Sequence, residues 1–266
     1  MSTSDTIITG IEGGVATFIL NRPEALNTLN PEMAEALRAA TAGLAANDGV
    51  RCVVIGGAGG HFMAGGDIGY FHQCLSLDPE ARAAAVGEVI GAVHATILNL
   101  RRMPQPVVAR VEGACAGFGV SLMAACDLAV CGDDTVFSLA YSHIGITPDG
   151  GSTWALPRIV GLKRAMAMVL LADRFGVDAA VDMGLVNQVV PKEKLHTTTA
   201  ELAARLAAGP SRAYAGAKAL LNESLQSSLE EQLRAEERQF MEGVKQADFE
   251  EGVRAFIDKR PPVFGD

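Results

Sequence analysis

The 266-residue sequence predicts an α/β fold with a parallel sheet at its centre and a helical C-terminal region. Two observations favour this class. Short apolar runs alternate with longer segments of helical periodicity as far as about residue 163, and this alternation is typical of α/β proteins. Beyond that point helical periodicity dominates, with one further strand expected.

The expected strands begin at the N-terminus. β-Branched runs at 6–9 and 15–20 flank Glu12-Gly13-Gly14, a turn that tolerates positive φ, so they predict a hairpin. The wholly apolar run at 52–55 predicts a strand of a sheet covered on both faces, and further strands are expected at 107–111 and 128–131. The last strand is expected at 185–190.

Helices are expected between and after these strands. Asn30-Pro31-Glu32 supplies a cap, a proline at the first helical position and an acid in the first turn, so a helix should run to about Ala46. A long helix is expected over 79–101, with its apolar stripe at Val86, Ile90, Val93 and Ile97. Small residues predict a helix over 117–125. Later helices are expected at 163–172, 191–208, 211–223, 229–245 and 249–259.

Composition excludes several classes of protein. The chain has 22 Lys and Arg against 31 Asp and Glu, a net charge of −9, which argues against a nucleic-acid partner. No apolar run is long enough for a membrane span, and the first residues do not resemble a targeting segment. The five cysteines show no metal or disulfide spacing. We therefore expect a cytoplasmic protein with reduced cysteines and no metal.

Glycine-rich turns occur at three predicted element ends. The segments 61–68 and 112–121 each follow a strand, and a helix that begins there leaves its first N–H groups without helical partners. If both sets of donors met, they would form an oxyanion hole. The third segment, 144–154, sets the carboxylate of Asp149 between a proline and two glycines. Each segment alone could equally be an ordinary turn or cap, and spacing does not establish that they converge.

Together with Asn21-Arg-Pro-Glu-Ala-Leu-Asn27, these segments resemble the crotonase family, also called the enoyl-CoA hydratase/isomerase superfamily. The resemblance continues through Gly184-Leu-Val-Asn187 to the segment 252–260, and so covers nearly the whole chain. It implies a spiral of ββα units over 1–195 that carries the acyl-CoA site. It also implies a helical region over 196–266, within the same structural unit, that forms homotrimers or dimers of trimers.

The resemblance also implies roles for individual residues. The oxyanion-hole donors would be the backbone N–H groups of Gly66 and Phe118. The substrate is an acyl-CoA thioester, so coenzyme A belongs to the substrate and no separate cofactor is expected. Lys259 or Arg260 of a neighbouring subunit would meet the CoA phosphates. The remaining substrate-binding residues would be Ala25, Leu26, Ala64, Gly65 and Tyr141.

Two departures from the family pattern predict the reaction. Hydratases of this family use two glutamates, and this sequence has Ser121 and Tyr141 at those places. Neither hydroxyl titrates in the range of a carboxylate. Asp149 remains, in a setting that resembles the phenylacetate-pathway isomerases. A single carboxylate can move a proton between two carbons of an enolate, so we expect an isomerase that shifts a double bond or a related group.

Other activities remain as alternatives. Hydration without the two glutamates is one, and acyl-CoA hydrolysis or a catalytically silent acyl-CoA-binding subunit are others. A 4-chlorobenzoyl-CoA dehalogenase would use Asp149 as a nucleophile, and His94 lies at the spacing of that branch's histidine, although such a helical histidine is more often structural. Gly66 argues against that branch, which has an aromatic residue there.

Overall fold

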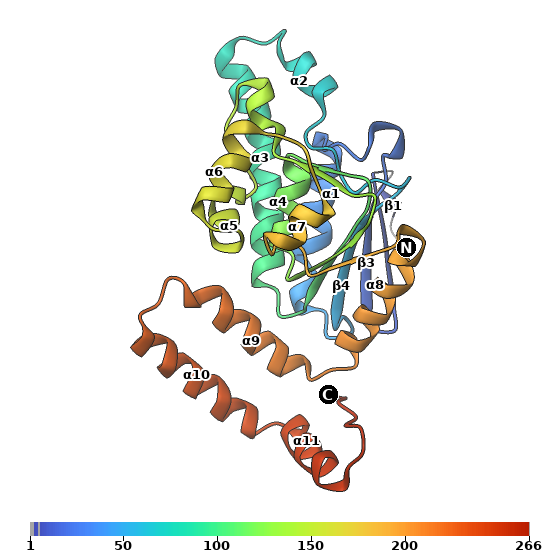
Figure 1. Ribbon diagram of the computed structural model, residues 1–266, viewed down its shortest axis with the longest axis vertical. Coiled ribbons are helices and arrows are strands. Elements are labelled where there is room, and N and C mark those ends of the chain that lie inside the picture. Colours follow the sequence, from blue (N-terminus) through green and yellow to red (C-terminus); the bar gives the residue numbers. More distant parts are fainter. Residues whose placement is uncertain (1–2, 5, 266) are drawn as a thin grey trace.

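A seven-stranded sheet forms the centre of the computed structural model, which describes residues 3–4 and 6–265 (Figure 1). The strand order is β1-β2-β3-β4-β5-β7-β10; β1 to β3 are antiparallel, whereas the pairs from β3 to β10 are parallel. A smaller sheet has the order β6-β8-β9. The strands are β1 (Thr3–Ser4), β2 (Ile7–Glu12), β3 (Val15–Leu20), β4 (Cys52–Gly57), β5 (Val107–Val111), β6 (Ala114–Ala116), β7 (Leu128–Gly132), β8 (Val136–Ser138), β9 (Phe175–Gly176) and β10 (Gln188–Val190).

The predicted strands are confirmed, and four of them, β2, β4, β7 and β10, differ in length from the prediction. Gly13 and Gly14 form the hairpin turn with φ of 55° and 76°, and β2 extends beyond the predicted 6–9. The strand predicted at 185–190 is reduced to β10 because Leu185 N–H donates back to the Ala180 carbonyl at the end of a helix.

Side chains on the two faces of the sheet belong to two separate apolar clusters. Val53 and Ile55 of β4 join the main core, to which α1 and α3 also contribute. Cys52 and Val54 join a smaller cluster with Leu195 of α8. The sheet is therefore covered on both faces, as the wholly apolar run at 52–55 predicts.

The helices follow the predicted segments to within a few residues, and several short ones were not predicted. They are α1 (Pro31–Ala42), α2 (Ile68–Cys74), α3 (Pro79–Arg102), α4 (Phe118–Ala125), α5 (Ser152–Ile159), α6 (Leu162–Leu171), α7 (Val177–Asp182), α8 (Lys192–Ala207), α9 (Ser211–Ser224), α10 (Leu229–Val244) and α11 (Ala247–Asp258). Short 3₁₀ helices are η1 (Pro23–Ala25), η2 (Leu44–Ala46) and η3 (Ala140–Ile144). The predicted first helix ends at Ala42, and its last residues form η2 after Gly43.

The predicted apolar stripe of α3 is wrong in register. The buried residues are Val89, Val93, Thr96 and Leu100, and only Val93 belongs to the predicted stripe. Small and apolar residues surround most of this helix, so periodicity alone does not identify the buried face. By length and composition α3 is also apolar enough to cross a membrane. One such helix is weak evidence, because core helices of soluble proteins pass the same test.

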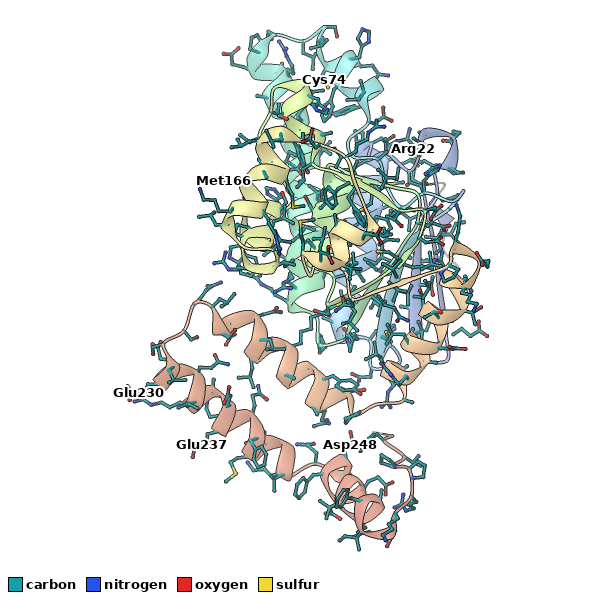
Figure 2. The ribbon with its side chains drawn as sticks, in the orientation of Figure 1. Arg22, Cys74, Met166, Glu230, Glu237 and Asp248 are labelled. Atoms are coloured by element: carbon teal, nitrogen blue, oxygen red, sulfur yellow. The ribbon has the colours of Figure 1, made fainter. Side chains whose placement is uncertain are left out.

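The last three helices extend from the body that holds the sheet (Figure 1). The boundary predicted at 195/196 falls inside α8, which packs against β4, β5 and β7. Lys218 of α9 connects the extension to the body: its ammonium donates to the Leu100 and Gln105 carbonyls, each at 2.9 Å, and pairs with Asp127 at 2.7 Å. Acidic side chains such as Glu230 and Glu237 are exposed along α10 (Figure 2). All five cysteines are free and buried, as predicted.

Candidate active site

The first part of the candidate site is the loop between β4 and α2. Its backbone pairs with the preceding 26–29 segment: Ala64 N–H donates to the Leu26 carbonyl at 3.0 Å, and Leu29 N–H donates to the Gly65 carbonyl at 2.8 Å. Gly65 has φ of 94°, a conformation that glycine adopts without a steric penalty. Three predicted substrate-binding residues, Leu26, Ala64 and Gly65, therefore lie in one backbone layer.

The N-terminus of α4 lies directly against this loop. Ala116 N–H donates to the Met63 carbonyl at 2.8 Å. A Cβ on Gly117 would lie 3.2 Å from the Gly65 Cα, so the two glycine loops touch. The contact that spacing could not establish is thus present.

The backbone N–H groups of Gly66 and Phe118 have no hydrogen-bond acceptor within residues 3–4 and 6–265. Phe118 is the first residue of α4, so its N–H has no helical partner and lies at the positive end of the helix. Gly66 lies in a parallel bridge whose hydrogen bonds use Gly65 and Asp67 instead. Two free donors therefore lie on touching loops, as an oxyanion hole requires.

The turn that carries Asp149 packs on the same end of α4. Gly150 has φ of 58°, and a Cβ there would lie 2.7 Å from the Phe118 ring and 2.9 Å from the Ser121 Cβ. The Phe118 ring is buried in the core beneath this turn. All three glycine-rich segments thus meet at the N-terminal half of α4.

Asp149 is held by Ser121 and Tyr141, the two residues expected at the places of the hydratase glutamates. The Tyr141 hydroxyl donates to Asp149 Oδ1 at 2.5 Å, and the Ser121 hydroxyl donates to the Asp149 main-chain oxygen at 3.0 Å. Burial raises the pKa of Asp149, and the Tyr141 hydrogen bond and the charge of His94 offset part of that effect. Burial and the adjacent carboxylate raise the pKa of Tyr141, so it stays a neutral donor. The arrangement provides a half-buried carboxylate whose basicity is raised.

His94 differs from the structural histidine that its helix position favours. It is exposed on α3, and its charge acts on Asp149. The dehalogenase alternative therefore stays open.

The remaining predicted substrate-binding residues lie in two places. Ala25 and the exposed Leu26 follow Arg22, whose guanidinium pairs with Asp67 at 2.8 Å. This ion pair, which the sequence did not indicate, connects the 22–29 segment to the loop between β4 and α2. Lys259 is exposed at the end of α11, at the opposite end of the molecule from α2, so one chain does not bring it to the site (Figure 1). Arg260 is paired with Glu251.

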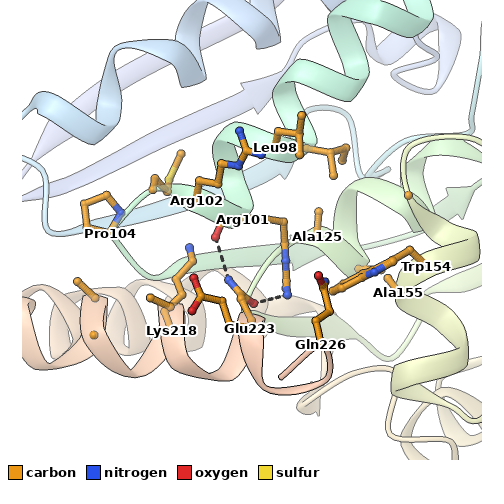
Figure 3. A pocket seen from close by; sticks show the side chains of 18 of the residues that line it. Leu98, Arg101, Arg102, Pro104, Ala125, Trp154, Ala155, Lys218, Glu223 and Gln226 are labelled. Carbon is orange, nitrogen blue, oxygen red and sulfur yellow. Dashed lines mark hydrogen bonds between the residues drawn. The ribbon is translucent and has the colours of Figure 1, made fainter. Parts of the chain in front are cut away.

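A cavity of about 890 Å³ borders the site on the side of α9 (Figure 3). Ser121 and Gly150 contribute to its lining, and its other walls come from α3, α5 and α9. Arg101 crosses it and exchanges hydrogen bonds with Asn222 of α9. Within the part of the chain that the structure describes, no group of three or more His, Cys, Asp or Glu is placed to hold a metal.

Comparisons with known proteins identify the family. The family model described as enoyl-CoA hydratase/isomerase matches residues 10–266. A "probable enoyl-CoA hydratase" of Rhodobacter capsulatus is 38% identical, and a 1,2-epoxyphenylacetyl-CoA isomerase of Escherichia coli is 34% identical; each alignment covers 97% of both chains. The crystal structure of an enoyl-CoA hydratase from Polaromonas sp. JS666 superposes with a TM-score of 0.91 at 34% identity, over 97% of this chain and 99% of that one. The chain therefore has the crotonase fold and belongs to the enoyl-CoA hydratase/isomerase family.

Proposed function

We propose that this protein is an acyl-CoA isomerase that shifts a double bond, or a related group, along an enoyl-CoA thioester. One observation carries the proposal. The Asp149 turn packs on α4 at Phe118, one of the two residues with a free backbone donor, whereas the places of both hydratase glutamates hold hydroxyl groups directed at Asp149 and its main chain. The site therefore offers one carboxylate base and no second carboxylate at those places to divide a water molecule.

The proposed reaction begins at the thioester carbonyl. The N–H groups of Gly66 and Phe118 would donate to its oxygen and stabilise the negative charge of the enolate. Asp149 would remove the proton from the carbon next to the carbonyl and return it two carbons away, so no water enters the product. Burial, which raises the Asp149 pKa, makes the carboxylate a stronger base at neutral pH.

The coenzyme A part of the substrate would lie along the backbone layer of the 25–26 and 64–65 segments. Lys259 would reach its phosphates from a neighbouring subunit, in a homotrimer or a dimer of trimers. Large apolar side chains on the helical extension support self-association: Phe240 is 70% exposed and Phe256 is 86% exposed. Sedimentation velocity would give the oligomer mass. The cytoplasmic location and the lack of a separate cofactor stay predictions.

A dehalogenase is the second candidate, because His94 acts electrostatically on Asp149. In that reaction Asp149 would attack an aromatic ring and displace chloride. Gly66 supports the isomerase instead, since a Cβ there would already lie 2.8 Å from the Phe71 ring and leaves no room for the aromatic residue of the dehalogenase branch.

Product analysis distinguishes the candidates. The wild-type protein is offered 3-enoyl-CoA, 2-enoyl-CoA and 4-chlorobenzoyl-CoA, and NMR and chloride release identify the products. We expect interconversion of the two enoyl isomers without 3-hydroxyacyl-CoA. Efficient hydration would instead support a hydratase, chloride release a dehalogenase, and tight binding with no turnover a silent acyl-CoA-binding subunit.

A further inference from the structure

The polar contacts of Asp149 leave its two carboxylate oxygens in different environments. Oδ1 accepts the Tyr141 hydrogen bond at 2.5 Å. Oδ2 accepts no hydrogen bond from another residue in the described part of the chain, and it is not a buried unsatisfied atom. We propose that Tyr141 is a positioning residue that holds Oδ1 and thereby leaves Oδ2 to carry the substrate proton. This inference rests on the proposed function, because it requires Asp149 to be the base.

The proton count of the three side chains supports this assignment. Tyr141 has one hydroxyl proton, and Asp149 Oδ1 receives it. Ser121 has one hydroxyl proton, for which the Asp149 main-chain oxygen lies at 3.0 Å. The Ser121 and Tyr141 oxygens are 3.3 Å apart, a longer contact than those the two hydroxyls make with Asp149, so we assign both protons to Asp149. Each hydroxyl proton therefore has an acceptor, and neither is directed at Oδ2.

Packing keeps Tyr141 in place. Tyr141 is 7% exposed and belongs to the main core. Two main-chain hydrogen bonds hold its backbone in η3: the Tyr141 N–H donates to the Leu139 carbonyl, and the Ile146 N–H donates to the Tyr141 carbonyl. Gly150, pressed against Phe118, fixes the other side of the Asp149 turn. A hydroxyl held in this way can orient a carboxylate without touching the substrate.

Groups from four elements face Asp149. Tyr141 comes from η3, His94 from α3, Ser121 from α4, and Ser152 of α5 donates to the Asp149 main-chain oxygen at 3.0 Å. Tyr141 and His94 favour the ionised carboxylate, whereas burial favours the neutral acid. Removal of the Tyr141 hydroxyl therefore takes away an interaction that lowers the pKa of Asp149, while the effect of burial remains, so this pKa rises.

The test is the pH dependence of kcat/KM for the shift of 3-enoyl-CoA to 2-enoyl-CoA. We expect Tyr141→Phe to move the acidic limb to higher pH and to lower kcat about 100-fold at neutral pH, with KM nearly unchanged. Tyr70→Phe is the matched control, because Tyr70 also donates one hydrogen bond, to the Ala85 carbonyl at 3.0 Å. Tyr70→Phe should keep the acidic limb of the kcat/KM profile at the wild-type pH.

A second variant keeps the side-chain volume in case Tyr141→Phe does not fold. Replacement of Tyr141 by 3-fluorotyrosine makes the phenol a stronger donor, so the acidic limb should move to lower pH. If the acidic limb of the kcat/KM profile stays at the wild-type pH in both Tyr141 variants, Tyr141 does not position Asp149. The proposed function has its own test: if Asp149→Asn keeps the bond shift, the assignment of the base fails; if it does not, an unchanged Tyr141→Phe profile refutes the positioning role alone.

Discussion

Substitution of Gly150 by alanine tests how closely the Asp149 turn is packed. Gly150 has φ of 58°, where an L-residue costs about 1–2 kcal/mol. Its Cβ would also lie 2.7 Å from the Phe118 ring and 2.9 Å from the Ser121 Cβ, and such overpacking costs about 1–3 kcal/mol. We expect the free energy of unfolding to fall by about 2–5 kcal/mol. Activity should fall as well, because Asp149 precedes this residue.

Gly151→Ala is the control for backbone strain. Gly151 has φ of 76°, but the nearest atom to its added Cβ is the Ile97 Cγ2 at 3.7 Å. This variant should lose only about 1–2 kcal/mol. Urea unfolding followed by circular dichroism, at one protein concentration, measures both variants. Equal losses would refute the close contact between Gly150 and α4.

Two further predictions concern buried charges. Lys218→Met leaves the Leu100 and Gln105 carbonyls and the Asp127 carboxylate without their ammonium partner. We therefore expect the free energy of unfolding to fall by about 3–5 kcal/mol. A fall of less than about 1 kcal/mol in urea unfolding would contradict the role of Lys218 in joining α9 to the body. Asp149→Asn should stabilise the protein at pH 7. The folded carboxyl binds its proton more tightly than the unfolded one, so wild-type stability falls as pH rises from the ordinary pKa of 3.8 through the raised value. The difference between the two proteins should therefore vanish below about pH 4, and a constant difference across pH would refute the raised pKa of Asp149.

The sheet was predictable because its strands carry a local signal. The wholly apolar run at 52–55 must be covered on both faces, and it becomes β4. The largely apolar runs at 107–111 and 128–131 become β5 and β7. The buried face of α3 was not predictable, since apolar residues lie on more than one side of it and tertiary packing selects among them.

The candidate site was only partly predictable for the same reason. Each glycine turn has a local signal, but the contact between Gly65 and Gly117 depends on how β4 and β6 are placed by the whole fold. At positions 121 and 141 the sequence shows that glutamates are missing. It does not show that Tyr141 turns its hydroxyl to Asp149, because that direction follows from the path of the intervening turn.

The rate of the double-bond shift in Asp149→Asn tests the central claim most directly. Asparagine keeps the size of the side chain and can still accept the Tyr141 hydrogen bond, so the turn should stay intact while the base is lost. A short-chain 3-enoyl-CoA is the substrate, and binding of the product CoA ester by calorimetry confirms that the site is formed. We predict normal binding and a fall in kcat of about 10²–10⁴-fold, the contribution of a positioned general base. A rate within tenfold of the wild type would contradict the assignment of Asp149 as the residue that moves the proton.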